Sequence, residues 1–557
     1  MYQINLEYMK KHIMSLFLLV LSFHMFAQIT EPDKAELEKR NWQHQNFAET
    51  GIYGIGTDAA IEFLKSKGLT PQTVVVGVLD SGIEIDHEDL KNNIWVNPKE
   101  VANNGKDDDK NGYVDDIHGW DFNVDGKNVD YNDETYEATR VVKRFMPLFA
   151  SANKRANVEN MKKMPAEYQE YLRARKYWAE KYYGAQTNLE NLEKDKKEIL
   201  PALNGLKSTF QSTKLSKEYV QNTADSDKIG KTEKEHIELL LAKNVDFEGH
   251  TLAEIIDRVE KRFNAMQERY EGEVKYAFNL DFDPTDGRTA STPKGFGNNE
   301  VEGPDAFHGT HVAGIIGAER NNGLGMNGVA GDVVKLMSVR MVPNGDERDL
   351  DVALGIRYAV DNGAKVLNMS FGKGFSPDKK VVMDAIKYAD RKGVLMFHAA
   401  GNDNKDLDFN HNYPSNFNHN EMKNLFKHWI TVGASTRDPQ NLKARFSNYG
   451  TMKVDIFAPG TEIYSTIQDN TYRYAQGTSM ASPVAAGAAA LIWAYFPHMK
   501  AHQVKEVLFE SVNKSDQISK IGSENDERKF SDLSATGGVI DVNKAVRLAY
   551  ERYGKKK

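Results

Sequence analysis

Two stretches of the chain are apolar without polar alternation and end abruptly in polar residues. They are "TVVVGVLDSG", residues 73–82, and "GVLMFHAAGNDN", residues 393–404. Unbroken apolar runs of this length are typical of strands buried on both faces of a parallel sheet. In open α/β sheets, ligands bind at the carboxyl ends of the strands. We therefore predict that polar residues ending these runs contribute to a site.

A third apolar run predicts a buried helix. Residues from Ala485 to Trp493 are mostly alanine and leucine, and Pro483 stands where the first turn of a helix tolerates a missing N–H. Ser479 would then lie at the helix N-terminus, where unpaired backbone N–H groups and the helix dipole favour negative charge. A serine at this place can equally be a simple helix cap.

The longest polar region, residues 132–297, is rich in lysine and glutamate and predicts helices. Two sequences of the form Thr-x-x-Glu, at 251–254 and 232–235, predict capping boxes at helix starts. Apolar side chains recur every seven residues, which is typical of a long packed helix. They are Tyr171, Trp178, Ala185, Leu192 and Ile199. The simplest interpretation is a helical bundle whose apolar stripes form its own core.

Composition narrows the class of protein. The chain has 557 residues and a formal net charge of −8, so it accommodates one large domain with an insertion and gives no reason to expect nucleic-acid binding. The apolar segment Ile13–Phe26 follows two lysines and precedes Ala27, which predicts a signal peptide at residues 1–27. We expect no transmembrane segment after its removal, and export to the periplasm or the medium.

The sequence contains no cysteine. A thiol nucleophile and a disulfide scaffold are therefore excluded. An exported protein without cross-links depends on its core or on bound ions for stability, which makes its acidic loops candidate metal sites.

Side chains with catalytic potential stand at the ends of the predicted elements. Asp80 ends the first strand, and Gly401-Asn402 ends the second, where an amide N–H₂ can be aimed at a developing oxyanion. His308 and His311 precede a helix pattern of small residues. A zinc pair is not indicated there, because the carboxylate of the H-E-x-x-H motif is missing. Each signal alone has an ordinary structural explanation.

Together these residues resemble one family, the subtilisin-like serine peptidases or subtilases. The order Asp80, His308, Ser479 is that of the family and differs from the order in chymotrypsin-like enzymes and α/β-hydrolases. The matching stretches are "VLDSGIEIDHEDL", "HGTHVAG", "NMSFG", "AAGN", "FSNYG", "VDIFAPG" and "GTSMASP".

The resemblance implies an α/β, three-layer subtilisin-like fold, in which helices flank a mostly parallel central sheet and an all-α insertion is added. The implied peptidase domain has two parts, residues 28–131 and 298–550. The insertion occupies 132–297 and a basic tail occupies 551–557.

The resemblance also implies a role for each candidate. Ser479 would attack a peptide carbonyl, with His308 as general base and then general acid. Asp80 would orient the imidazole, and Asn402 would stabilise the oxyanion. His311 is then a packed structural histidine, and catalysis needs no cofactor.

A substrate-binding strand is implied by "KVLNMSFGKG", residues 365–374. Ser370, Phe371 and Gly372 would pair with the backbone of an extended peptide, beside Gly401. The expected partners are protein or peptide substrates. The helical insertion would gate the site, contact a partner or assist folding.

Two acidic regions are candidate calcium sites. "NGKDDDKNGYVDD" matches the first nine positions of an EF-hand loop, although His118 stands where a bidentate glutamate would close it. The alternative is a solvated Asx-rich turn. The ligands would be Asp107, Asp109, Asn111, Tyr113 and Asp115. The resemblance implies a second, structural site with Asp89 and Asn321, or with Asn322 because that loop is one residue longer than usual.

The leading hypothesis is a secreted serine endopeptidase. Two other functions remain open: a non-catalytic or weakly active scaffold whose insertion binds a partner, and an esterase or amidase with the same acyl-transfer chemistry. An intact set of four catalytic candidates argues against a pure scaffold, which has no use for all of them.

Overall fold

The computed structural model describes residues 34–285, 288, 295–418, 421–522 and 526–554. The predicted signal peptide lies outside these residues. Helix α2 (Lys34–Arg40) belongs to one compact unit, and the chain from Asn41 onward forms a second unit, described below. Among the described helices, none combines the length and the apolar character needed to cross a membrane.

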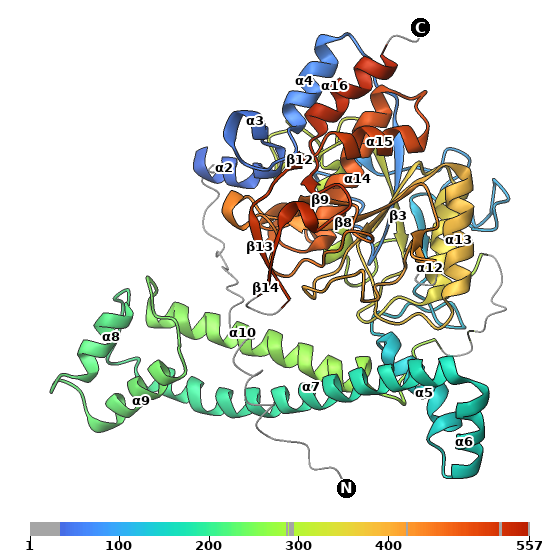
Figure 1. Cartoon of the computed structure of the whole chain (residues 1–557). Coiled ribbons are helices and arrows are strands. Elements are labelled where there is room, and N and C mark those ends of the chain that lie inside the picture. Colours follow the sequence, from blue (N-terminus) through green and yellow to red (C-terminus); the bar gives the residue numbers. More distant parts are fainter. Residues whose placement is uncertain (1–33, 286–287, 289–294, 419–420, 523–525, 555–557) are drawn as a thin grey trace. The chain divides into compact units, whose positions relative to one another are not determined.

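A nine-stranded sheet lies at the centre of the second unit (Figure 1). Its strand order is β12-β15-β9-β8-β5-β4-β1-β3-β2, and every neighbouring pair is parallel except β12 with β15. The strands are β1 (Val74–Asp80), β2 (Gly119–Asp121), β3 (Val334–Arg340), β4 (Val366–Met369), β5 (Leu395–Ala399), β8 (Trp429–Ser435), β9 (Ile456–Pro459), β12 (Asn513–Lys514) and β15 (Gly538–Val539). Both apolar runs predicted as buried strands form β1 and β5.

Helices cover both faces of the sheet, which confirms the predicted three-layer architecture. On one face, α4 (Thr57–Ser66), α11 (Phe307–Gly317), α14 (Thr478–Tyr495), α15 (Ala501–Glu510) and α16 (Val542–Tyr553) contribute to one apolar core. On the other face, α12 (Asp349–Asp361) and α13 (Lys379–Lys392) contribute to a second core. Val76 of β1 belongs to the first core and Leu79 to the second, because alternate residues of a strand face opposite sides.

The second unit also contains short ribbons and short helices. Three antiparallel ribbons are formed by β6 (Phe417–Asn418) with β7 (Lys423–Asn424), β10 (Ile463–Ile467) with β11 (Thr471–Ala475), and β13 (Ile518–Ile521) with β14 (Asp526–Lys529). The short helices are α3 (Phe47–Thr50), η2 (Trp42–His44), η3 (Lys91–Asn93), η5 (Pro439–Asn441) and η6 (Phe530–Asp532).

The region between β2 and α11 is helical. Its elements are α5 (Glu137–Phe149), α6 (Lys154–Lys163), α7 (Pro165–Gly205), α8 (Lys217–Ala224), α9 (Lys231–Ala242), α10 (Leu252–Gly272) and the π-helical turn η4 (Glu273–Ala277). The predicted long helix is α7, on which Tyr171, Ala185, Leu192 and Ile199 are buried. Figure 1 shows α10 running beside α7, with α8 and α9 at one end of the pair.

One of the two predicted capping boxes forms and the other does not. Thr251 Oγ1 accepts the backbone N–H of Glu254, and Glu254 Oε2 accepts the backbone N–H of Thr251 at 2.7 Å. The predicted box at Thr232 is wrong, because the extended backbone at Gly230 starts α9 at Lys231 and places Thr232 inside the helix.

We predict that Thr251→Ala lowers the free energy of unfolding by about 1 kcal/mol, because the helix loses its N-cap acceptor. The matched control is Thr232→Ala, which removes the same atoms from an exposed helical position that supplies no cap. It should leave stability unchanged or slightly higher, since alanine has the better helix propensity. Urea unfolding followed by far-ultraviolet circular dichroism compares the two; equal midpoints would contradict the assignment.

Candidate active site

The first two catalytic candidates meet at the carboxyl end of β1. Asp80 is the last residue of β1, His308 is the second residue of α11, and His308 Nδ1 lies 2.6 Å from Asp80 Oδ1. The Asp80 side chain is 1% exposed and also accepts the backbone N–H of Ser81 at 2.8 Å. A carboxylate acceptor at Nδ1 keeps the proton of a neutral imidazole on Nδ1, which leaves Nε2 as the basic nitrogen.

Gly309 allows α11 to approach β1 this closely. A Cβ atom at Gly309 would lie 2.0 Å from the carbonyl oxygen of Gly82 and 3.2 Å from Cβ of Asp80. Any larger residue would push His308 away from its carboxylate partner. The small-residue pattern that follows His308 in the sequence therefore has a direct role in the geometry of the pair.

Asp80 controls the pKa of His308. Burial alone would lower this pKa, but the charge of Asp80 and the hydrogen bond to it outweigh burial and raise the pKa above 6.5. The His308 side chain remains 37% exposed. The imidazolium form is consequently stabilised, as a group that receives a proton during a reaction requires.

Ser479 lies on α14 and is bound to the end of β4 by two reciprocal hydrogen bonds. Its hydroxyl donates to the Ser370 carbonyl at 3.0 Å, and the Ser370 hydroxyl donates to the Ser479 carbonyl at 2.8 Å. The Ser479 carbonyl is available because Pro483, four positions later, has no N–H to donate within the helix. Since α14 begins at Thr478, Pro483 lies beyond the first turn in which the sequence pattern placed it.

A buried network orients the Ser370 hydroxyl. Asn368 Nδ2 donates to Ser370 Oγ at 2.9 Å, and Ser482 Oγ donates to Asn368 Oδ1 at 2.8 Å. Asn368 and Ser482 are both 0% exposed. The sequence analysis missed these two residues, although a polar residue inside the buried run "VLNM" is a signal that could have found Asn368.

The structure does not place a hydrogen bond between Ser479 and His308. Within the described ranges, the only acceptor of the Ser479 hydroxyl is the Ser370 carbonyl. Catalytic hydrogen bonds are often long or unformed until a substrate is bound, so the absence of this bond is compatible with the predicted role of Ser479.

Asn402 presents its amide N–H₂ group beside the N-terminus of α14. Its Oδ1 accepts the backbone N–H of Thr478 at 2.9 Å and the Thr478 hydroxyl at 3.0 Å. The same hydroxyl accepts the backbone N–H of Gly401 at 3.0 Å. Because Oδ1 is fixed, Nδ2 is directed away from Thr478. Among the described residues, neither Asn402 Nδ2 nor the backbone N–H of Ser479 has an acceptor, so both remain available for an anion.

The predicted substrate strand continues directly from β4. Gly372 is exposed, whereas Phe371 is 9% exposed. Asn412 lies beside the strand: a Cβ at Gly372 would be 2.5 Å from Asn412 Oδ1, and one at Gly401 would be 3.5 Å from Asn412 Nδ2. Asn412 therefore forms a wall between the two glycines that were predicted to bind substrate. The sequence analysis did not identify it.

The acidic loop brings together a set of carboxylates that only partly overlaps the predicted one. Oxygen atoms of Glu100, Asp109 and Asp116 lie within 4.8 Å of one another. Burial raises the pKa of Asp116 to about 6. Asp115 turns the other way and accepts the backbone N–H groups of Asn104 and Gly105 at 3.1 and 2.8 Å.

The other three predicted ligands lie in or beside this loop. Asp107 accepts the backbone N–H groups of Asn111 and Gly112, at 3.0 and 2.8 Å. Asn111 Nδ2 donates to Asp116 Oδ2 at 2.9 Å. The ring of Tyr113 packs edge-on against Trp120, Phe122 and Tyr358.

The second predicted calcium site pairs Asp89 with Asn322. Asn322 Nδ2 donates to Asp89 Oδ1 at 2.7 Å, and Asp89 is 0% exposed. Burial raises the pKa of Asp89, and its Oδ2 has no hydrogen-bond partner among the described residues. Asn321 donates its backbone N–H to Asn327. Of the two asparagines predicted as alternatives, Asn322 is the one whose side chain contacts Asp89.

His311 is a packed structural histidine, as the sequence analysis expected. It is 0% exposed, and its Nε2 lies 3.0 Å from the Arg473 carbonyl. Burial lowers the pKa of His311 to about 4, so the ring stays neutral and donates to that carbonyl.

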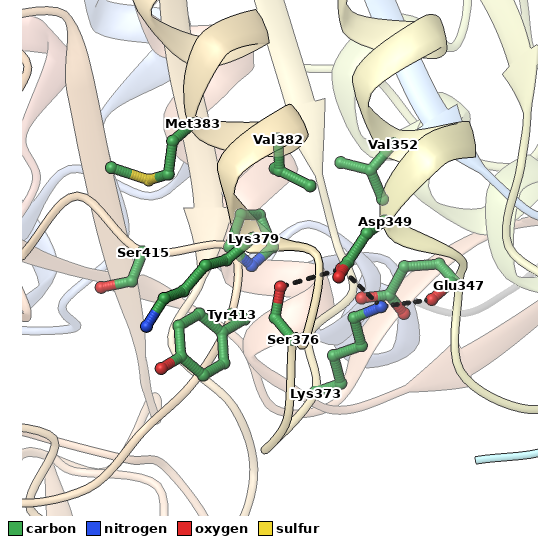
Figure 2. Close-up of a pocket in the computed structure, with 11 residues that line it drawn as sticks. Glu347, Asp349, Val352, Lys373, Ser376, Lys379, Val382, Met383, Tyr413 and Ser415 are labelled. Carbon is green, nitrogen blue, oxygen red and sulfur yellow. Dashed lines mark hydrogen bonds and ion pairs between the residues drawn. The ribbon is translucent and has the colours of Figure 1, made fainter. Parts of the chain in front are cut away.

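The pocket in Figure 2 includes Lys373, next to the predicted substrate strand, and its lining contains none of the four catalytic candidates. Lys373, Asp349, Ser376 and Glu347 line it and pair with one another. Lys373 Nζ lies 2.8 Å from Asp349 Oδ1 and 2.6 Å from the Glu347 carbonyl. The charges of Lys373 and Asp349 thus pair with each other, whereas Glu347 takes part through its backbone carbonyl and its Oε1 has no hydrogen-bond partner among the described residues.

The chain is similar to known proteins over a region much longer than the candidate site. The profile described as "Subtilase family" matches residues 72–531. Cell wall-associated protease of Bacillus subtilis (strain 168) is 39% identical over 228 residues, which cover 39% of this chain and 23% of that protein. Thermophilic serine proteinase of Bacillus sp. (strain AK1) is 42% identical over 33% of this chain and 42% of that protein. Thermitase of Thermoactinomyces vulgaris is 37% identical over 33% of this chain and 60% of that protein.

The chain thus matches less than two thirds of the length of each of these relatives. The profile, in contrast, covers most of the chain and includes the strand ends and helix N-termini that carry Asp80, His308, Asn402 and Ser479. Together with the parallel sheet, this match shows that the chain belongs to the subtilase family.

Proposed function

We propose that the protein is a serine endopeptidase that hydrolyses peptide bonds through an acyl-enzyme formed on Ser479. The observation that carries the proposal is the 2.6 Å hydrogen bond between Asp80 and His308, at the same sheet edge as a serine on a helix N-terminus. A buried carboxylate that raises the pKa of a neighbouring imidazole is the arrangement that general-base activation of a hydroxyl requires.

The reaction proceeds in two acyl-transfer steps. Ser479 Oγ attacks the peptide carbonyl carbon while His308 Nε2 takes the hydroxyl proton, and the imidazolium then returns that proton to the leaving amine. Water hydrolyses the resulting ester by the same route. Asp80 remains ionised and stabilises the transient imidazolium.

The tetrahedral intermediates carry a negative oxygen that Asn402 Nδ2 and the Ser479 backbone N–H can bind. Both donors lie at the N-terminus of α14, where the helix dipole also favours negative charge. The hydrogen bonds from Thr478 to Asn402 Oδ1 orient the N–H₂ group before negative charge develops on the substrate oxygen. Donors that are oriented in advance lower the activation barrier of the reaction.

The substrates we propose are proteins or peptides in extended conformation. The segment from Ser370 to Gly372, of which Gly372 is exposed, offers backbone groups for pairing with a peptide, a recognition mode that depends little on side chains. We also propose that the protein acts outside the cytoplasm, which is supported by the apolar segment Ile13–Phe26 near the start of the sequence.

We further propose structural calcium at the two acidic positions. Glu100 Oε2 and Asp89 Oδ2 are buried oxygens without a hydrogen-bond partner among the described residues. Calcium prefers such oxygen ligands, and the groups around both positions are carboxylates and side-chain amides. The ion would hold Glu100 to Asp109 and Asp116 in the first site, and Asp89 to Asn322 in the second.

We predict that Ser479→Ala abolishes casein hydrolysis, with a loss of roughly a millionfold that takes the rate below detection. A phosphonylating reagent should inactivate the wild type to the same extent. Proteolysis by Ser479→Ala would contradict the mechanism. Hydrolysis of simple esters by the wild type without any proteolysis would identify an esterase instead, and no Ser479-dependent hydrolysis at all would indicate a scaffold.

We predict that kcat/KM increases with pH through a pKa above 6.5, because His308 must be neutral to act as a base and Asp80 raises its pKa. Asp80→Asn removes that charge and leaves burial to lower the pKa, so the rising limb should move to lower pH. The rate should also fall by roughly 10⁴-fold. The measurement is kcat/KM on one peptide substrate over about pH 5 to 9; an unmoved limb would contradict the role of Asp80.

We predict that a calcium chelator lowers the melting temperature and that added calcium restores it, because an ion bound only to the folded state stabilises that state by about 2.7 kcal/mol at a concentration of 100 Kd. Asp109→Asn and Asp89→Asn should each reduce this dependence. Thermal unfolding with calcium, and with magnesium as the control ion, provides the measurement. A melting temperature that is independent of both ions would exclude the two sites.

A further inference from the structure

The strand that follows β4 has two edges, and the peptidase core pairs its backbone with one of them. Lys373 pairs with Tyr413 through two backbone hydrogen bonds, of 3.0 and 2.8 Å. Successive residues of a strand present their backbone groups to opposite edges. Ser370, Gly372 and Gly374 therefore face the other edge, on which the Ser370 carbonyl accepts the hydroxyl of the nucleophile.

The free part of this second edge is short. Gly372 is exposed, and among the described residues its backbone N–H and C=O have no hydrogen-bond partner. The carbonyl of Gly374, two positions further, accepts a 2.8 Å hydrogen bond from Nη1 of Arg173. Because Arg173 belongs to α7, a side chain of the helical insertion occupies the next backbone acceptor along the strand.

Arg173 is held in this position from two sides. Its guanidinium forms a two-pronged ion pair with Glu170, with Nη2 to Oε1 at 2.8 Å and Nε to Oε2 at 3.1 Å. It also lies 3.9 Å from the ring centroid of Phe375. Phe375 is 5% exposed and shares an apolar core with α5 and the beginning of α7. The guanidinium therefore cannot leave Gly374 without losing both contacts.

Helix α7 also contacts Phe375 beyond Arg173. Tyr177, one turn after Arg173, places its ring 5.9 Å from that of Phe375. Burial, together with the carboxylates of Asp346 and Asp403, raises the pKa of the Tyr177 hydroxyl. Asp346 follows β3 and Asp403 follows β5, which lie on opposite sides of β4 in the sheet.

The base of the insertion is fastened to the same strand by buried charges. Lys373 Nζ lies 2.6 Å from Glu137 Oε2 of α5, and the two side chains are 1% and 6% exposed. Figure 2 shows Lys373 directed at Asp349 and Glu347 in the pocket beside the strand. Although burial alone would raise the pKa of Glu137, the charges of Arg140 and Lys373 lower it to about 2, so this pair stays ionised.

We propose that the insertion ends the peptide-binding ladder at Gly372 and that Arg173 is the residue that closes it. This inference rests on the proposed peptidase function. A peptide whose scissile carbonyl lies at Ser479 pairs its first residue upstream of the cleaved bond with Ser370 and its third with Gly372. Its fifth residue would need the Gly374 carbonyl, which Arg173 occupies.

The substrate class follows from this register. The enzyme pairs with three extended residues before the cleaved bond, and the chain upstream of them has to turn away from the strand where Arg173 binds Gly374. Flexible segments can make this turn, whereas a rigid strand that stays extended over five or more residues cannot. Arg173 is therefore a specificity-determining residue for the length of the extended segment.

The test is a series of acetylated peptidyl p-nitroanilides that share the residue next to the cleaved bond and contain one to six upstream residues. In the wild type, kcat/KM should rise as the peptide is lengthened to three upstream residues. From three to six residues it should change by less than about twofold, because one backbone hydrogen bond is worth about a 2- to 10-fold gain and the strand offers no further one beyond Gly372. In Arg173→Ala, kcat/KM should rise by about 2- to 10-fold between four and five residues.

Two further variants sharpen the result. Arg173→Met removes the donor but keeps an aliphatic chain over Phe375, and it should show part of the gain if Arg173→Ala folds poorly. Arg175→Ala removes the same charge from an exposed position of α7 and should keep the wild-type length dependence. Each effect is read as the ratio of long to short peptides within one variant.

The outcomes separate this inference from the function on which it rests. If kcat/KM of the wild type increases steadily from four to six upstream residues, the proposed role of Arg173 is wrong. It is also wrong if kcat/KM of the Arg173 variants does not increase between four and five upstream residues. Absence of Ser479-dependent cleavage for every peptide would overturn the proposed peptidase itself.

Discussion

The close packing of α14 against the sheet is the constraint on which the active site depends. Ala485 and Ala489 are fully buried, and a helix of small residues can lie near the strands. Because α14 lies close to the sheet, Ser482 of α14 donates a hydrogen bond to Asn368 of β4. For the same reason, Ser479 and Ser370 donate hydrogen bonds to each other's carbonyl groups. A small displacement of α14 would break these hydrogen bonds. Protein interiors are packed as densely as organic crystals, so neighbouring groups have little room to move and compensate. The position of Ser479 is therefore determined by the apolar packing of the helix that carries it.

Local patterns in the sequence predicted the parts of the molecule that depend on strand and helix ends. Unbroken apolar runs placed Asp80 at the end of one buried strand and Asn402 after another, and in the structure Asp80 is the last residue of β1 and Asn402 follows β5. Heptad spacing predicted α7. The contact of Asp80 with His308, 228 positions away, came from family resemblance, because no local pattern specifies contacts between distant segments.

The remaining site residues depend on backbone conformation and long-range packing that the sequence pattern does not encode. Asp115 adopts a positive φ of 54°, which turns its carboxylate toward the turn at Asn104 and leaves Asp116 to face Asp109. Asn412 is a loop residue without a motif, and it gains its place only when two glycines from separate strands leave room beside it. The strand order of the sheet is likewise a property of the whole fold.

The helical insertion has two separate apolar cores that share only α7. One core joins α5 and the beginning of α7 to Phe375, and the other joins the end of α7 to α8, α9 and α10. Effects of substitutions at well-separated sites are generally additive. Substitutions in the outer core should therefore leave the inner core, which contains Phe375, largely unchanged.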